Sequence, residues 1–318
     1  MGLICRLKTK DQLIRAIALN GRARVFVCVT TSLVQELQTR HQLWPVASAA
    51  LGRTATIAAM MGLNLKNEER LTIRIKGDGP LGQVVVDANS EGCVRGYVEH
   101  PDVSIPLNSK GKLDVGGAVG RGMLYITRDT GLKDYYTGSS ELQSGEIADD
   151  FTYYFVVSEQ TPSATGAGVL VNVDYSIICA GGFLVQLMPG YTDEDIEFLE
   201  SRLEAIQSVT DVLQTGASAE ELLRRLVPDA QIVDSADPQF FCTCSEDRIA
   251  QVLRSLGRNE LQSMVDEQRG AQIICHFCGE VYDFSEEYLE EMIIELGKEG
   301  PNYDGLVETK PYPGYGDT

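Results

Sequence analysis

Alternating apolar and polar residues mark several short segments in the first 190 residues, and this alternation predicts β-strands. Gly-rich turns such as Gly77-Asp78-Gly79-Pro80 separate successive segments, as in an antiparallel meander. The expected strands and β-rich runs are Ala23–Val29, Leu71–Lys76, Gly82–Ala88, Cys93–Glu99, Gly122–Arg128, Phe151–Val157, Gly168–Val173 and Gly182–Met188.

Helical spacing of apolar residues appears in the same half of the chain, at Asp11–Leu19 and Ser32–Gln38. The most apolar segment, Leu43–Leu65, is rich in Ala, Gly and Thr and carries Arg53 near its middle. Because an arginine at that depth is costly in a membrane, we expect a buried helix and no membrane association. Residues 1–190 are therefore predicted to form a mixed α+β core domain with antiparallel sheets.

The pattern becomes purely helical after residue 190. Thr192 or Asp193 can cap a helix whose apolar positions continue to Leu213. Ser218 followed by Glu221 forms a capping box for a second helix. We expect residues 191–238 to be a helical linker whose apolar stripe must rest on another part of the protein.

Two smaller segments complete the predicted organisation. Residues 239–296 hold two close pairs of cysteines around a helical stretch, Asp247–Glu267, and are expected to be a small domain. Residues 297–318, rich in Pro, Gly and Tyr, are expected to be a disordered tail.

Charge is distributed unevenly along the chain, whose formal net charge is −19. Residues 1–150 carry 18 Lys and Arg against 16 Asp and Glu, whereas residues 151–318 carry 9 against 30. An acidic half repels phosphate backbones, so cysteine pairs within it are not expected to form a nucleic-acid finger. A solvated acidic surface that aids solubility explains much of this charge.

The eight cysteines fall into two groups. Cys5, Cys28, Cys93 and Cys179 stand alone in apolar contexts, where buried inert thiols are expected. Met1–Thr9 lacks the long apolar stretch of a secretory signal, so we expect a cytoplasmic protein with reduced thiols.

The other four cysteines form a metal-binding pattern. Cys242-Thr243-Cys244 and Cys275-His276-Phe277-Cys278 supply two thiolates each, and Gly279 permits the tight turn of the second pair. Four thiolates are the preferred ligands of tetrahedral structural zinc, so one zinc ion is predicted on these cysteines. His276 is not needed as a ligand, since four sulfurs already fill the tetrahedron.

The pairs also permit a redox role, because the sulfurs within each pair are close enough along the chain to join. Zinc on such sites contributes roughly 10–16 kcal/mol of apparent folding free energy. A segment this short has too little core to replace that contribution, and a disulfide closing a very small loop restrains the unfolded chain little. Oxidation is thus expected to unfold the segment and to release apolar surface.

Two other interpretations stay open at this stage. A thiol–disulfide oxidoreductase would use Cys275 and Cys278, although the pair lacks the helix N-terminus that activates a thioredoxin-like thiol. A purely structural zinc module would keep its fold and partners in peroxide. The glycine-rich run Gly116–Gly122 matches neither common nucleotide-binding fingerprint, and with three histidines in the chain no hydrolase triad is recognisable.

At these residues the chain resembles the redox-regulated 33 kDa heat-shock chaperonin family of bacteria. The C-terminal motifs that carry the resemblance are Phe241-Cys242-Thr243-Cys244-Ser245 and Ile274-Cys275-His276-Phe277-Cys278. Upstream, it is carried by Gly77–Gly82, Arg95-Gly96-Tyr97, Ser144–Ala148, Ser158–Ala164, Ala180-Gly181-Gly182 and Met188-Pro189-Gly190.

The resemblance implies a chaperone and not an enzyme: an α+β core, a metastable linker and a zinc domain that together hold unfolding client proteins without ATP under oxidative stress. It implies zinc on Cys242, Cys244, Cys275 and Cys278 in the reduced, inactive state. It also implies Cys242–Cys244 and Cys275–Cys278 disulfides after oxidation. Members occur as monomers and as dimers, so a homodimer of the oxidised protein stays open.

Overall fold

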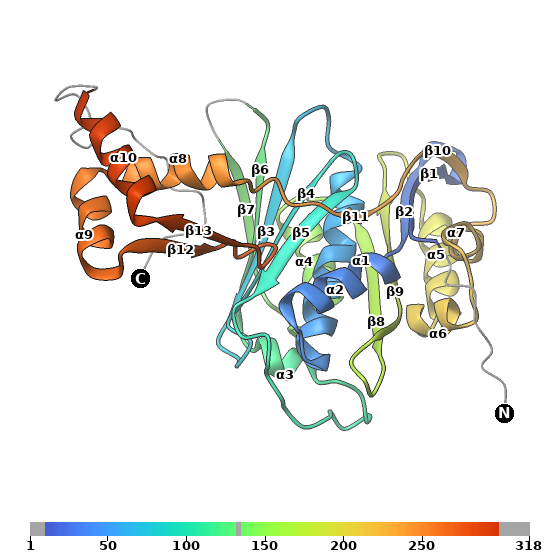
Figure 1. Ribbon diagram of the computed structural model, residues 1–318. Coiled ribbons are helices and arrows are strands. Elements are labelled where there is room, and N and C mark those ends of the chain that lie inside the picture. The colour runs from blue at the N-terminus through green and yellow to red at the C-terminus, as the bar shows by residue number, and fades with distance from the viewer. Residues whose placement is uncertain (1–9, 132–134, 299–318) are drawn as a thin grey trace. The chain divides into compact units, whose positions relative to one another are not determined.

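Two antiparallel sheets and the helix between them make up most of the first part of the protein. The computed structural model describes residues 10–131 and 135–298, and the chain divides after Cys242 into two compact units (Figure 1). Strands and helices are mixed and the sheets are antiparallel, so the predicted α+β class is confirmed. The predicted domain limits at residues 190, 238 and 296 stay predictions.

The first sheet has five strands in the described residues, in the order β10-β1-β2-β9-β8, and each neighbouring pair is antiparallel. The strands are β1 (Gln12–Ala18), β2 (Ala23–Val29), β8 (Ser163–Val171), β9 (Ile177–Leu187) and β10 (Gln231–Ala236).

The helix predicted at Asp11–Leu19 is wrong, because this segment is strand β1. The strand is paired on both edges and covered on both faces, so Leu13 and Ile14 are both buried, in different hydrophobic clusters. Burial on both faces removes the strict alternation of an exposed strand, and the remaining apolar spacing imitates a helix.

The second sheet has the order β11-β5-β4-β3-β6-β7 and includes the predicted meander. Its strands are β3 (Arg70–Gly77), β4 (Gln83–Asn89), β5 (Cys93–Val98), β6 (Gly122–Asp129), β7 (Tyr136–Glu141) and β11 (Gln239–Phe240). The pairs are antiparallel except that β11 runs parallel to β5. This exception places the chain just before Cys242 on the edge of the sheet.

Helix α2 (Pro45–Gly62) lies between the two sheets, as Figure 1 shows, and is buried along most of its length. It confirms the buried helix expected at Leu43–Leu65, and α1 (Thr31–His41) confirms the helix expected at Ser32–Gln38. No helix within the described ranges is long and apolar enough to cross a membrane.

The strand predicted at Phe151–Val157 is wrong, because these residues belong to helix α4 (Ala148–Val157). The buried Asp150 carboxylate accepts hydrogen bonds from the backbone N–H groups of Gln143 and Ile147, 2.7 and 3.0 Å away, and so holds the start of the helix. Phe151, Tyr154 and Phe155 then share its buried face, a helical spacing that their β-favouring residue types obscured. A five-residue helix, α3 (Val115–Val119), precedes β6.

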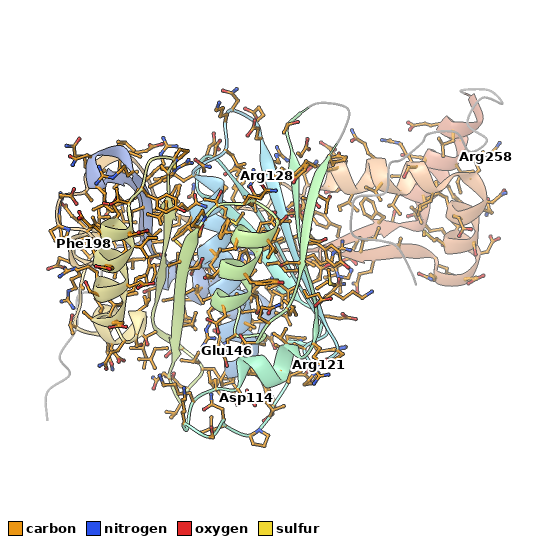
Figure 2. The ribbon with its side chains drawn as sticks, turned by 180° about the vertical axis from the view of Figure 1, so that it is seen from behind. Asp114, Arg121, Arg128, Glu146, Phe198 and Arg258 are labelled. Carbon is orange, nitrogen blue, oxygen red and sulfur yellow. The ribbon has the colours of Figure 1, made fainter. Side chains whose placement is uncertain are left out.

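Three helices follow β9 and cover the face of the five-stranded sheet that lies opposite α2. They are α5 (Asp193–Glu204), α6 (Val209–Gln214) and α7 (Ala219–Leu226). Their apolar residues form one cluster with Ile14, Val25 and Cys179 of the sheet, and Phe198 of α5 packs against it (Figure 2). The expected apolar stripe therefore rests on the core sheet, although the first predicted helix is broken into two before Ser208.

The second unit is built from helices around a hairpin. Its elements are α8 (Glu246–Leu256), α9 (Arg258–Gln268), β12 (Gly270–Ile274), β13 (Val281–Ser285) and α10 (Glu286–Lys298). Among the described residues its hydrophobic cluster has eight buried members, including Leu253, Leu261 and Phe284. Helix α10 includes the first two residues of the predicted tail, whose remainder lies outside the described residues.

Candidate metal centre

The four paired cysteines come together in space. Cys242 and Cys244 lie on the segment between β11 and α8, and Cys275 and Cys278 lie in the β12–β13 turn. Their Sγ atoms all lie within 4.8 Å of one another. Four sulfurs at a Zn–S distance of about 2.3 Å would be about 3.8 Å apart, so this set has the size and donor type for a tetrahedral zinc site.

The second cysteine pair is fixed by the backbone of the hairpin. The N–H of Cys275 donates to the carbonyl of Glu280 at 2.9 Å, and the N–H of Gly279 donates to the carbonyl of Cys275 at 2.8 Å. Gly279 has a φ of 73°, a conformation that glycine adopts without strain. The turn expected at this glycine is therefore confirmed.

The first pair is held by the start of α8. The Ser245 hydroxyl accepts the backbone N–H of Arg248 at 3.3 Å and so caps the helix. The Arg248 guanidinium donates to the Thr243 hydroxyl at 2.9 Å, which fixes the residue between the two cysteines. The Cys242–Cys244 segment is thus tied to the first turn of α8.

Two polar side chains touch the sulfurs and were not assigned to the site from the sequence. The Tyr282 hydroxyl donates to Cys244 Sγ at 3.1 Å, and this hydrogen bond raises the pKa of the phenol well above its usual range. The Arg95 guanidinium lies 3.6 Å from Cys242 Sγ and pairs with Asp87 at 2.8 Å. Both side chains favour negative charge on sulfur, which metal-bound thiolates carry.

The paired cysteines differ from the solitary ones in exposure. Cys242, Cys244 and Cys275 are half-buried, and Cys278 is buried. Burial raises the pKa of Cys28 far above its usual range and that of Cys179 to about 11, so both thiols stay protonated and inert. Cys93 is half-buried, which corrects the expectation of burial for that residue, and Cys5 lies outside the described residues.

The surroundings of the Cys275–Cys278 pair bear on the alternatives. The pair sits between two strands and not at the first turn of a helix, so the thiol activation used by thioredoxin-like enzymes has no counterpart here. His276 is exposed and does not belong to the group of candidate ligands that the described residues form. No disulfide joins the seven cysteines in the described part of the chain.

Comparison with known proteins gives one consistent family. The family model described as Hsp33 protein matches residues 11–285. A 33 kDa chaperonin of Staphylococcus epidermidis is 46% identical over 288 residues, which are 90% of this chain and 98% of that protein. A 33 kDa chaperonin of Staphylococcus aureus is 45% identical over 291 residues, 91% and 99% of the two chains.

A solved structure agrees with these relatives. The crystal structure of a 33 kDa chaperonin from Thermotoga maritima superposes with a TM-score of 0.85 at 36% sequence identity. The match covers 91% of this chain and 99% of that one. The similarity therefore extends through both compact units.

Proposed function

The chain belongs to the Hsp33 family, and from this premise we propose that it is a redox-regulated, ATP-independent chaperone that holds unfolding proteins. The observation that carries the proposal is the group of four cysteines whose sulfurs lie within 4.8 Å of one another, three of them in the second unit with its small hydrophobic cluster. The name of the relatives, 33 kDa chaperonin, supports chaperone activity. The four clustered cysteines support its regulation by oxidation.

In the reduced protein, Cys242, Cys244, Cys275 and Cys278 would hold one zinc ion as thiolates. When bound, zinc supplies a cross-link between the β12–β13 turn and the segment before α8. Tyr282 and Arg95 would orient and stabilise the sulfurs, as outer partners of metal ligands commonly do. This state is proposed to be the inactive one.

Oxidation would convert the thiolates to disulfides. Each pair of thiolates loses two electrons to an oxidant such as peroxide, which is reduced to water, and one S–S bond forms. Cys242–Cys244 and Cys275–Cys278 are the proposed pairs. The Sγ atoms of Cys244 and Cys278 are also only 3.2 Å apart, so a Cys244–Cys278 disulfide is an alternative to the proposed pairs. Disulfide mapping of the oxidised protein by mass spectrometry distinguishes the two possibilities.

Loss of the cross-link would loosen the second unit and then residues 191–238. Helices α5–α7 cover one face of the five-stranded sheet, and their removal would expose Val25, Val27 and Leu222. An exposed apolar surface of this kind binds other apolar chains. The proposed partners are therefore unfolding proteins, and neither nucleic acid nor membrane is proposed. Dimerisation of the oxidised form and a cytoplasmic location stay part of the proposal.

One sample tests the proposal in two measurements. Zinc content and the suppression of aggregation of a heat-unfolding client are measured before and after treatment with peroxide. We expect one zinc per reduced chain without suppression, and zinc-free oxidised protein with suppression at equal molarity. Oxidised, zinc-free protein that turns over a dithiol substrate but does not suppress aggregation would instead favour the oxidoreductase.

A further inference from the structure

Strand β11 is a short segment of the chain's own backbone laid on the open edge of β5. The N–H of Gln239 donates to the carbonyl of Gly92 at 3.0 Å, and the N–H of Phe241 donates to the carbonyl of Val94 at 3.1 Å. The register pairs Gln239 with Cys93 and Phe240 with Val94. Cys242, two residues after the end of β11, is a proposed zinc ligand.

Every second side chain of residues 238–241 packs against the body of the first unit. Pro238 is buried, and the half-buried Phe240 packs against the main hydrophobic cluster with its ring centroid 4.4 Å from Arg40 Cζ. Gln239 and Phe241 point away, and Phe241 is 52% exposed. Backbone pairing with every second side chain in a pocket is how proteins recognise added extended peptides.

Both ends of β11 are attached to segments that the proposed function loosens. Residues 191–238 precede it, and Cys242 follows it by two residues. With two residues in register, β11 has little pairing of its own to hold it when both neighbours become mobile. Its departure would leave the backbone carbonyls of Gly92, just before β5, and of Val94, in β5, without these partners. An open strand edge is a template for another extended chain.

We propose that the β5 edge is a client-binding site of the oxidised protein, and that β11 is its intramolecular occupant in the reduced state. The ligand is an extended segment of an unfolding protein, with an aromatic side chain in the place of Phe240. Arg40 above that place favours an aromatic ring through a cation–π contact. Backbone pairing tolerates different sequences, whereas folded proteins rarely present such segments. This inference rests on the proposed function, because it requires β11 to be released.

A disulfide tether tests the site directly. Gln239 and Cys93 are register partners, and Gln239 Nε2 lies 3.9 Å from Cys93 Sγ, so Gln239→Cys places a thiol beside Cys93. Oxidation would then lock β11 on the edge while α5–α7 and the four ligands remain unaltered. The matched control combines Gln239→Cys with Cys93→Ser, which cannot form the tether.

We expect the tethered variant to release zinc like the control, and to suppress client aggregation roughly tenfold less per mole, as expected when a central binding element is blocked. Tethered protein that releases zinc and holds clients as well as the control overturns the inference and leaves the proposed function intact. If the control and the native protein both fail to suppress aggregation after zinc release, the proposed function fails instead.

A peptide supplies an independent readout. A fluorescent peptide with the sequence of residues 235–241 contains no cysteine and is titrated with oxidised and reduced protein by fluorescence anisotropy. We expect binding to the oxidised form only, roughly tenfold weaker binding for the Phe240→Ala peptide and a much smaller change for the Phe241→Ala peptide, since a few buried aromatic anchors dominate such contacts. Equal binding to both redox forms, or equal loss for both alanine peptides, contradicts the site.

Discussion

The two compact units differ in the size of their hydrophobic clusters. In the first unit, α2 and two sheets enclose a large cluster of buried side chains, among them Leu51, Ile57 and Ile73. In the second, the cluster of the described residues has eight buried members, and the unit holds three of the four clustered cysteines, Cys244, Cys275 and Cys278. A large hydrophobic core persists in an oxidant, whereas a metal cross-link through sulfur does not. Under the proposed function, this difference would let one chain combine a durable scaffold with a part that opens.

The largest expected effect is loss of one sulfur ligand. Cys244→Ser should weaken zinc binding roughly 100-fold or more, because zinc contributes about 10–16 kcal/mol to small thiolate sites. The reduced variant should then suppress client aggregation without oxidant. Metal analysis and an aggregation assay check this, with Cys93→Ser as the control that keeps zinc. Normal zinc content in Cys244→Ser would refute the assignment of this ligand.

A core substitution in the linker helices should separate the effect of linker release from the effect of zinc loss. Leu222 is fully buried against the five-stranded sheet, so Leu222→Ala should cost about 2–5 kcal/mol of α7 docking. The reduced variant should keep its zinc and yet hold clients in part. Glu220→Ala on the exposed side of α7 is the matched control. If the reduced Leu222→Ala variant suppresses client aggregation no better than the native reduced protein, release of the linker does not limit activation of the chaperone.

A smaller effect is expected at the sulfur's hydrogen bond. Tyr282→Phe removes the hydroxyl that donates to Cys244 and should speed zinc release in peroxide, with zinc affinity lowered about 10-fold, the lower end for lost outer partners of metal ligands. Release is followed with a chromogenic zinc chelator. Tyr288→Phe, on the neighbouring helix α10, is the control. Identical release rates in both variants would show that the Tyr282 hydroxyl does not stabilise the centre.

The smallest expected effect is a change in thermal stability at acidic pH. The Asp195 carboxylate accepts two hydrogen bonds from Arg22 at 2.7 and 2.8 Å, which hold its pKa well below the usual 3.8. A carboxylate with a depressed folded pKa binds fewer protons when folded, so its stabilisation is full above about pH 4 and is lost as pH falls through the folded pKa. The difference in thermal midpoint between native protein and Asp195→Asn should therefore shrink below pH 4. A difference independent of pH would contradict this role.

The features that were predicted correctly from the sequence are those that depend on residues close together in the chain. Ser218 and Glu221 form the expected capping box, Thr192 caps α5, and the cysteine pairs are adjacent along the chain. Features that depend on the fold were missed. Tyr282 and Arg95 lie 38 and 147 residues from the cysteines they touch, so only the tertiary structure brings them to the site.

The two wrong element predictions have the same origin. Asp11–Leu19 resembled a helix because strand β1 is buried on both faces, and Phe151–Val157 resembled a strand because aromatic and β-branched residues fill a helix. In both segments the tertiary environment determines the structure against the local pattern. The linker helices were recognisable, whereas the sheet face that they cover was not.

Hydrogen exchange on the full chain, reduced and then oxidised with zinc removed, tests the central claim most directly. We expect backbone amides of residues 243–298 and of α5–α7 to lose protection, while those of α2, β2 and β3 keep it. Retained protection in α8–α10 and α5–α7 after oxidation and loss of zinc would contradict the account.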